Sequence, residues 1–187
     1  MKLSALLRLF GTSVVSAQSF LSATGAYPQL SQFRQLLINQ PNIAGLLLAT
    51  TNGTNDNQTT VLVPNNNAFD NYHRNTGQYV EGLQSSDLTD LVHYHSLNGA
   101  LSSSDLQKPT GLVASTSLTD PRYDNRGLGS NGAMQSQVVY VGSNSANQPR
   151  QNMNSSGLYV QSGLVSNSPL NTIDGTWDGG LFHIVDE

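Results

Sequence analysis

Two histidines separated by a single residue, His93 and His95, are the pair in this sequence best spaced for metal chemistry. On a β-strand alternate side chains share a face, so these imidazoles and a third ligand such as His183 could together bind zinc. On an α-helix the same spacing turns the two side chains about 200° apart. The apolar residues from Leu88 to Val92 recur at helical intervals, so we expect a helix here and neither a metal nor another cofactor.

Two pairs of acidic residues in polar stretches offer the other chemistry that the sequence allows. Asp174 lies four residues before Asp178, and Asp120 lies four residues before Asp124. A glycosidase needs two carboxyl groups at a set separation, so a secreted glycan-active hydrolase that uses such a pair is the alternative function. Acids spaced in this way in loops are more often solvated, and we therefore expect no catalytic residues.

Other enzyme motifs give no support for catalysis. The chain has no cysteine and no Gly-x-Ser-x-Gly motif, which excludes a thiolate nucleophile and the hydrolase elbow built on that motif. The string from Gly127 to Gly132 matches the dinucleotide-binding fingerprint in letters. It follows polar residues instead of a strand and opens no helix, so we interpret it as a loop.

The elements that position these residues are organised around the stretch from Thr59 to Phe69. Its first half is apolar and β-branched, which favours a buried strand, and Pro64 should end that strand because proline donates no hydrogen bond. Asn65 then stands where a helix N-cap would, and Phe69 and Tyr72 follow at helical spacing. The stretch predicts a strand, a sharp corner and a helix.

A helix beginning at Ser86 is predicted to carry His95, with Gly99 as its stop. His95 falls within the apolar stripe of this helix, where the usual state is a neutral ring hydrogen-bonded through both nitrogens. We interpret His183 in the same way, because it alternates with apolar residues of a predicted strand.

Apart from the strand that ends at Pro64, the predicted helices lie in the first half of the chain and the predicted strands in the second. Helical patterns begin near Pro28, end before Pro41, and resume behind Asn42. The second half carries short strand-like segments at 111–118, 137–141, 158–161 and 181–185. This segregation predicts an α+β domain whose sheet is largely antiparallel.

Composition and length limit the remaining possibilities. At 187 residues the chain suits one domain, and its formal net charge of −4 argues against nucleic acid as a partner. No later segment approaches the roughly 18 apolar residues of a membrane span.

The N-terminus resembles a secretory leader. Lys2 precedes a mostly apolar run, and Val15-Ser16-Ala17 offers small residues to signal peptidase, so we expect a signal peptide at 1–17 and one domain at 18–187. Arg8 interrupts the apolar run, and an amphipathic first helix is the alternative. Secretion fits three N-glycosylation sequons, at Asn52, Asn57 and Asn154.

Three stretches, in this order, resemble the fasciclin domain family of extracellular adhesion modules. They are Thr60-Val-Leu-Val-Pro-Asn-Asn-Asn-Ala-Phe69, Leu91-Val-His-Tyr-His-Ser-Leu-Asn-Gly99 and Gly179-Gly-Leu-Phe-His-Ile-Val-Asp186. Asn65 replaces the usual threonine and Gly179 the usual asparagine, and the Gly-Gly pair is similar to the variety of filamentous fungi. Family members continue beyond the last Asp, so we interpret the end at Glu187 as that of a fragment.

The resemblance implies a wedge of mostly antiparallel β-strands with helices packed along one side. It also implies a secreted, non-enzymatic module that is associated with the cell surface or wall and binds extracellular proteins or glycans. In animal relatives the Tyr-His region is linked to adhesion, which would correspond to Tyr94 and His95 here.

Overall fold

The computed structural model of this protein describes residues 19–49, 58–123, 136–143, 157–162 and 167–186. The predicted leader, the three sequon asparagines, Asp124 and the glycine string at 127–132 lie outside the described residues. The helices are α1 (Phe20–Ala23), α2 (Ser31–Asn39), α3 (Pro41–Ala49), α4 (Asn66–Thr76), α5 (Ser85–His95) and α6 (Ser103–Leu106). The strands are β1 (Thr59–Pro64), β2 (Ser96–Asn98), β3 (Leu112–Ser115), β4 (Val138–Ser143), β5 (Leu158–Gln161), β6 (Asn167–Trp177) and β7 (Gly180–Val185).

The strands form one sheet in the order β2-β1-β7-β6-β5-β4-β3. All neighbouring pairs are antiparallel except β1 with β7, which is parallel. The two edges approach each other, because Leu97 of β2 bridges Thr116, just beyond β3, and the Ser117 amide donates to the Ser96 carbonyl at 2.7 Å. The sheet therefore curves nearly into a barrel.

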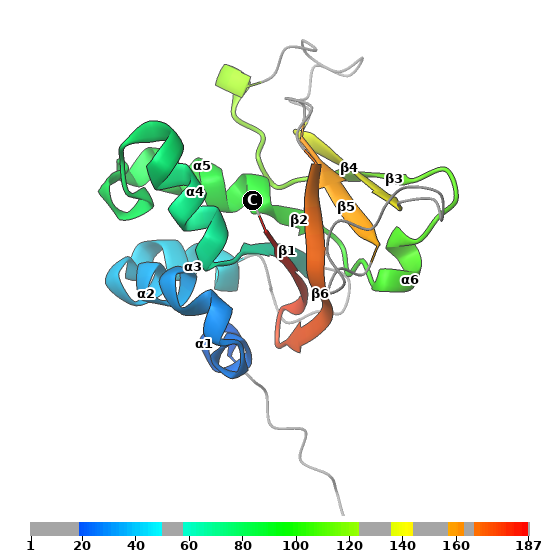
Figure 1. The fold of residues 1–187 in the computed structure, drawn as a ribbon, viewed down its shortest axis with the longest axis horizontal. Coiled ribbons are helices and arrows are strands. Elements are labelled where there is room, and N and C mark those ends of the chain that lie inside the picture. Colours follow the sequence, from blue (N-terminus) through cyan, green and yellow to red (C-terminus); the bar gives the residue numbers. More distant parts are fainter. Residues whose placement is uncertain (1–18, 50–57, 124–135, 144–156, 163–166, 187) are drawn as a thin grey trace, which may run out of the picture.

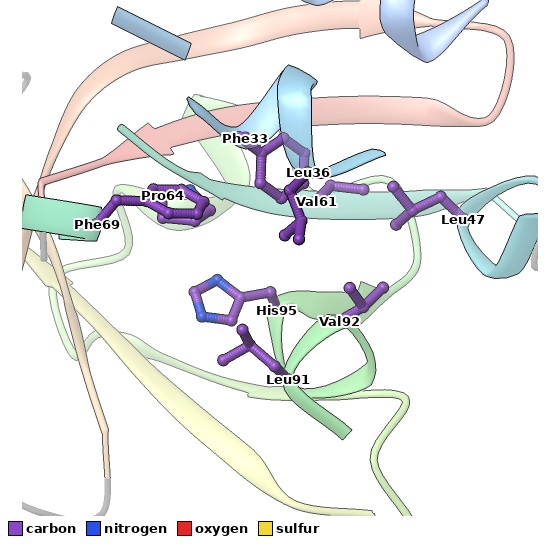
Figure 2. Close-up of a pocket in the computed structure, with 9 residues that line it drawn as sticks. All are labelled: Phe33, Leu36, Leu47, Val61, Pro64, Phe69, Leu91, Val92 and His95. Atoms are coloured by element: carbon purple, nitrogen blue, oxygen red, sulfur yellow. The ribbon is translucent and has the colours of Figure 1, made fainter. Parts of the chain in front are cut away.

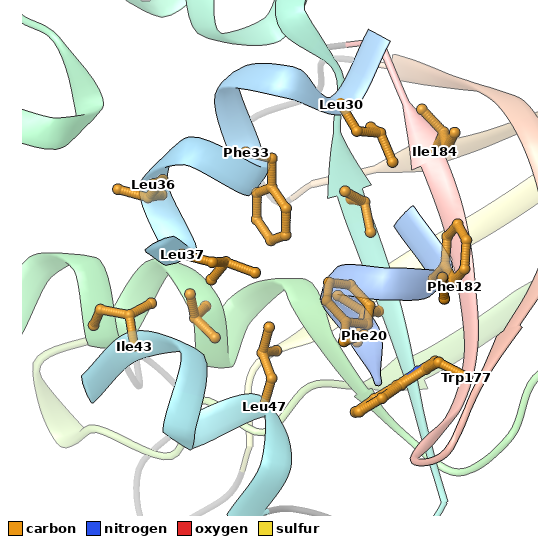
Figure 3. Close-up of a cluster of buried hydrophobic side chains, with 14 of the residues drawn as sticks. Phe20, Leu30, Phe33, Leu36, Leu37, Ile43, Leu47, Trp177, Phe182 and Ile184 are labelled. Atoms are coloured by element: carbon orange, nitrogen blue, oxygen red, sulfur yellow. The ribbon is translucent and has the colours of Figure 1, made fainter. Parts of the chain in front are cut away.

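Helices α1 to α5 gather on one side of the sheet (Figure 1). Their apolar side chains pack against alternate residues of the neighbouring strands β1 and β7, such as Val61 and Phe182, and together these form the helix-side core. In this helix-side core, Phe20 of α1 lies edge-on to Trp177 at the end of β6, with ring centroids 4.9 Å apart (Figure 3). The residues nearest the predicted leader junction thus belong to the main core.

The opposite face of the sheet encloses a second apolar cluster, the barrel core. Side chains alternate across a strand, so Leu62 and Val185 point away from the helix-side core while their neighbours point into it. The barrel core consists of Leu62, Leu97, Leu106, Ala114, Val139, Val141, Leu158, Val160, Leu170 and Val185.

The predicted strand, corner and helix are confirmed. β1 ends at Pro64, and the side-chain oxygen of Asn65 accepts a hydrogen bond from the Ala68 amide at 3.1 Å, which caps α4. The same side chain donates to Asp186 Oδ1 at 2.5 Å and so connects the corner to the end of β7. The α+β class, with a mostly antiparallel sheet and helices along one side, is confirmed as well.

Two strands differ from the prediction. The helix expected to run to Gly99 ends at His95, because residues 96–98 pair with β1 as strand β2. The long strand β6 went unpredicted, because its register against β7 shifts on both sides of Thr172 and interrupts the alternation that marks a strand. Asp174, within β6, has a φ of 59°, a left-handed conformation that interrupts the strand pattern further.

Candidate functional site

His95 is the last residue of α5, and its ring is hydrogen-bonded to strand β1. Its Nδ1 lies 2.8 Å from the carbonyl oxygen of Leu62. A carbonyl oxygen can only accept, so Nδ1 carries the proton and Nε2 of the neutral ring is left as an acceptor. None of the hydrogen bonds in the described part of the chain involves Nε2. The prediction of bonds through both nitrogens is therefore correct for Nδ1 and wrong for Nε2.

The environment of His95 keeps its ring neutral. Burial lowers the pKa of the imidazole, and the hydrogen bond to the Leu62 carbonyl offsets only part of that effect. At pH 7 the ring is consequently a hydrogen-bond donor at one nitrogen and an acceptor at the other.

Tyr94 is half-buried beside His95 and packs against the barrel core. The two rings meet edge to face, with centroids 6.3 Å apart and an interplanar angle of 77°. The structure thus brings the two residues of the predicted adhesion motif together, with their partly exposed edges at the end of α5. Their role in adhesion stays a prediction.

Two hollows meet at His95. The smaller one, of about 20 Å³, lies between α2, α3, β1, α4 and α5 and is lined by apolar residues such as Phe33, Val61 and Leu91 (Figure 2). It is about the size of a single water molecule, and its apolar lining gives water no set of polar partners. The larger one, of about 180 Å³, lies on the barrel-core side of His95.

Apart from Tyr94 and His95, the larger hollow is built from residues that the sequence analysis did not single out. Four aliphatic side chains, one each from β1, β7, β5 and β4, form its walls: Leu62, Val185, Val160 and Val139. Tyr94, His95, Ser162 and Ser168 complete the lining. The strand segments themselves predict apolar inward positions, but no local signal shows that they surround a space beside His95.

His183 of β7 is fully buried and hydrogen-bonded through both ring nitrogens, which confirms its interpretation as a core group. Nε2 lies 2.8 Å from the Leu101 carbonyl, and Nδ1 accepts from the Asp174 amide at 3.1 Å. Burial lowers the pKa of this imidazole, so the ring is neutral at pH 7.

The histidines do not converge on a common site. His93 and His95 both lie on α5, where their spacing directs them to different sides of the helix. In the part of the chain that the structure describes, no group of three or more histidine, aspartate or glutamate side chains is arranged to hold a metal ion.

Asp174 and Asp120, one member of each predicted pair, are engaged by the fold itself, whereas Asp178 is exposed. Asp174 accepts hydrogen bonds from the backbone amide of Ser103, at 2.7 Å, and from its hydroxyl. Asp120 accepts from the backbone and side chain of Arg122, which also reaches Asp90, and these hydrogen bonds lower the pKa of the Asp120 carboxyl. No acidic residue lines either hollow at His95, so nothing at this site supports the hydrolase alternative.

Comparison with known proteins identifies the family to which this architecture belongs. No curated protein sequence matches the chain significantly. Among solved structures, a FAS1 domain pair from the insect cell adhesion molecule fasciclin I aligns with a TM-score of 0.54 at 15% identity. The alignment covers 85% of this chain and 44% of that one, so this chain spans less than half the length of the pair. The model of the fasciclin domain matches residues 28–187, most of the sequence, and the chain therefore belongs to the fasciclin family.

Proposed function

We propose that this protein is a secreted, non-enzymatic adhesion module that binds extracellular proteins or glycans of the cell surface or wall. The observation that carries the proposal is the match of the fasciclin domain to residues 28–187. The resemblance in fold to an insect cell adhesion molecule supports the same kind of activity.

Sequence features support an extracellular location. The predicted signal peptide at 1–17 would export the chain, and the sequons at Asn52, Asn57 and Asn154 would be glycosylated on the way. Among the described residues, none of the helices is both long and apolar enough to cross a bilayer.

We place the adhesive contact at the exposed edges of Tyr94 and His95. An aromatic ring beside a polar ring gives a partner both apolar area and hydrogen bonding, which is the composition of many interface hot spots. The bond from His95 to the Leu62 carbonyl fixes the end of α5 against β1, so the contact surface is held before a partner arrives.

Adhesion of cells and binding of wall polysaccharides to the immobilised secreted protein tests this function. We expect saturable binding that Tyr94→Ala reduces at least fivefold. Tyr79→Ala is the matched control, because Tyr79 is 64% exposed, stacks on His73 and lies apart from the motif. Both variants should keep their circular dichroism spectra. Absence of binding by the folded wild type, while an unrelated adhesive control binds, would overturn the proposal.

A further inference from the structure

The larger hollow beside His95 lies at one end of the barrel core. Its walls come from four strands that are distant in sequence, and Val160 and Val185 are almost fully buried. Side chains from a rigid sheet hold the walls, and His95 is fixed by its bond to Leu62. The space is therefore largely formed without a ligand, as small-molecule sites usually are.

The size of the hollow limits what it can hold. Its volume of about 180 Å³ is close to that of an engineered apolar cavity, roughly 150 Å³, that binds benzene in another protein. It is smaller than the roughly 300 to 1,000 Å³ of sites for drug-sized ligands. One aromatic ring or a short aliphatic chain fits, and a sugar chain does not.

The chemistry of the lining limits the guest further. No charged side chain lines the hollow, so a charged guest would lose its hydration without gaining a counterion. His95 lines the hollow, and its Nε2 is an acceptor that takes part in none of the hydrogen bonds of the described residues, so a guest hydroxyl that reaches it can donate a hydrogen bond to it. Two serine hydroxyls, of Ser162 and Ser168, complete the polar side.

We propose that this hollow is a binding site for a small neutral phenol or short-chain alcohol. The ring or chain packs against Leu62, Val139, Val160 and Val185, and the guest hydroxyl donates a hydrogen bond to Nε2 of His95. Tyr94 and His95 border both this hollow and the proposed adhesive contact, whereas the aliphatic walls of the hollow belong to guest binding alone.

Titration of the secreted protein with 4-fluorophenol, followed by fluorine NMR, tests the site directly. We expect a saturable shift, and binding about threefold to tenfold tighter than that of fluorobenzene, which lacks the donor. An equal concentration of benzoate should not compete. A shift that does not saturate, equal affinity for both probes, or competition by benzoate would each contradict the proposal.

Variants locate the binding within the protein. Val160→Phe fills the hollow and should abolish the shift, whereas Val113→Phe adds the same ring at a 64% exposed position of strand β3 and should preserve it. If Val160→Phe fails to fold, Ser162→Phe fills the same space from its half-buried rim. Unchanged affinity in the folded filling variants would place the probe elsewhere and refute the assignment. Loss of adhesion with phenol binding retained, or the reverse, separates this site from the adhesion function.

Discussion

Replacement of His183 by alanine probes the interior of the sheet most sharply. The His183 ring joins β7 to two other segments, since Nε2 donates to the Leu101 carbonyl and Nδ1 accepts from the Asp174 amide. His183→Ala leaves both of these backbone groups without their partner, although Leu101 is only half-buried and Asp174 is exposed, so water can replace part of what is lost. Asp174 is also in the left-handed conformation, so the lost bond acts on a residue that is already strained.

The expected cost follows from these two groups. An unsatisfied backbone group costs about 1 to 3 kcal/mol when it is buried, and because both groups here are only partly buried, the two together should cost about 2 to 3 kcal/mol. A domain of this kind has a total stability of about 5 to 15 kcal/mol, so the variant should lose a measurable part of it. His93→Ala is the matched control, because none of the hydrogen bonds in the described structure involves the His93 ring.

The stability should also depend on pH through the same ring. Burial lowers the pKa of His183 below its ordinary value of 6.5, so the unfolded chain binds the proton more readily than the folded one. The stability that the neutral His183 ring contributes is complete above pH 6.5 and is lost as the pH falls from there through the lowered pKa. His95 has a lowered pKa too and acts in the same direction.

Urea unfolding between pH 8 and pH 5, monitored by Trp177 fluorescence, measures both effects. We expect the wild type to unfold at lower urea concentrations as the pH falls below 6.5, and His183→Ala to show a shallower dependence. The reasoning is refuted if His183→Ala has the wild-type midpoint at pH 8, or if its pH dependence equals that of the wild type.

Three further substitutions should change thermal stability in ways that follow from single contacts. Phe20→Ala should lower the free energy of unfolding by about 3 to 5 kcal/mol, because the ring packs edge-on against Trp177 in the helix-side core. Unchanged stability would exclude the residues near position 20 from the domain. Asn65→Ala removes the cap of α4 and the bond to Asp186, and it should cost at least about 1 kcal/mol of stability. Asn65→Thr keeps the cap and should cost less. Equal losses in the two variants would show that the cap is unimportant. Gly180→Ala should prevent stable folding, because the added Cβ would lie 2.3 Å from a backbone oxygen of β1 and the φ of Gly180 is 135°. A variant that melts at the wild-type temperature would contradict the close approach of β1 and β7.

Local sequence signals predicted the corner at Asn65 and the burial of His183. Both depend on neighbours in the chain: proline ends the strand, asparagine caps the next helix, and alternation places His183 inward. Each signal is complete within about ten residues, so the tertiary structure did not need to be known.

Features that depend on distant pairing were missed. Strand β2 replaces the expected end of a helix, because the Ser96 segment gains hydrogen bonds to β1 that no local pattern reveals. The hollow beside His95 requires residues from four strands to meet, and the unpartnered Nε2 is visible only once Leu62 is placed. The hydrogen bond between His95 and Leu62 joins residues 33 positions apart, and hydrophobic periodicity carries no information over such a separation.

His95 and His183 are expected to be neutral rings that hold the scaffold together without binding a metal ion. Long-range proton–nitrogen correlation spectra of the imidazoles at pH 7.5 test it most directly. We predict opposite neutral tautomers, with the proton on Nδ1 in His95 and on Nε2 in His183, unchanged by an equimolar amount of zinc. A cationic ring at either position, or zinc-dependent shifts at both, would contradict the claim.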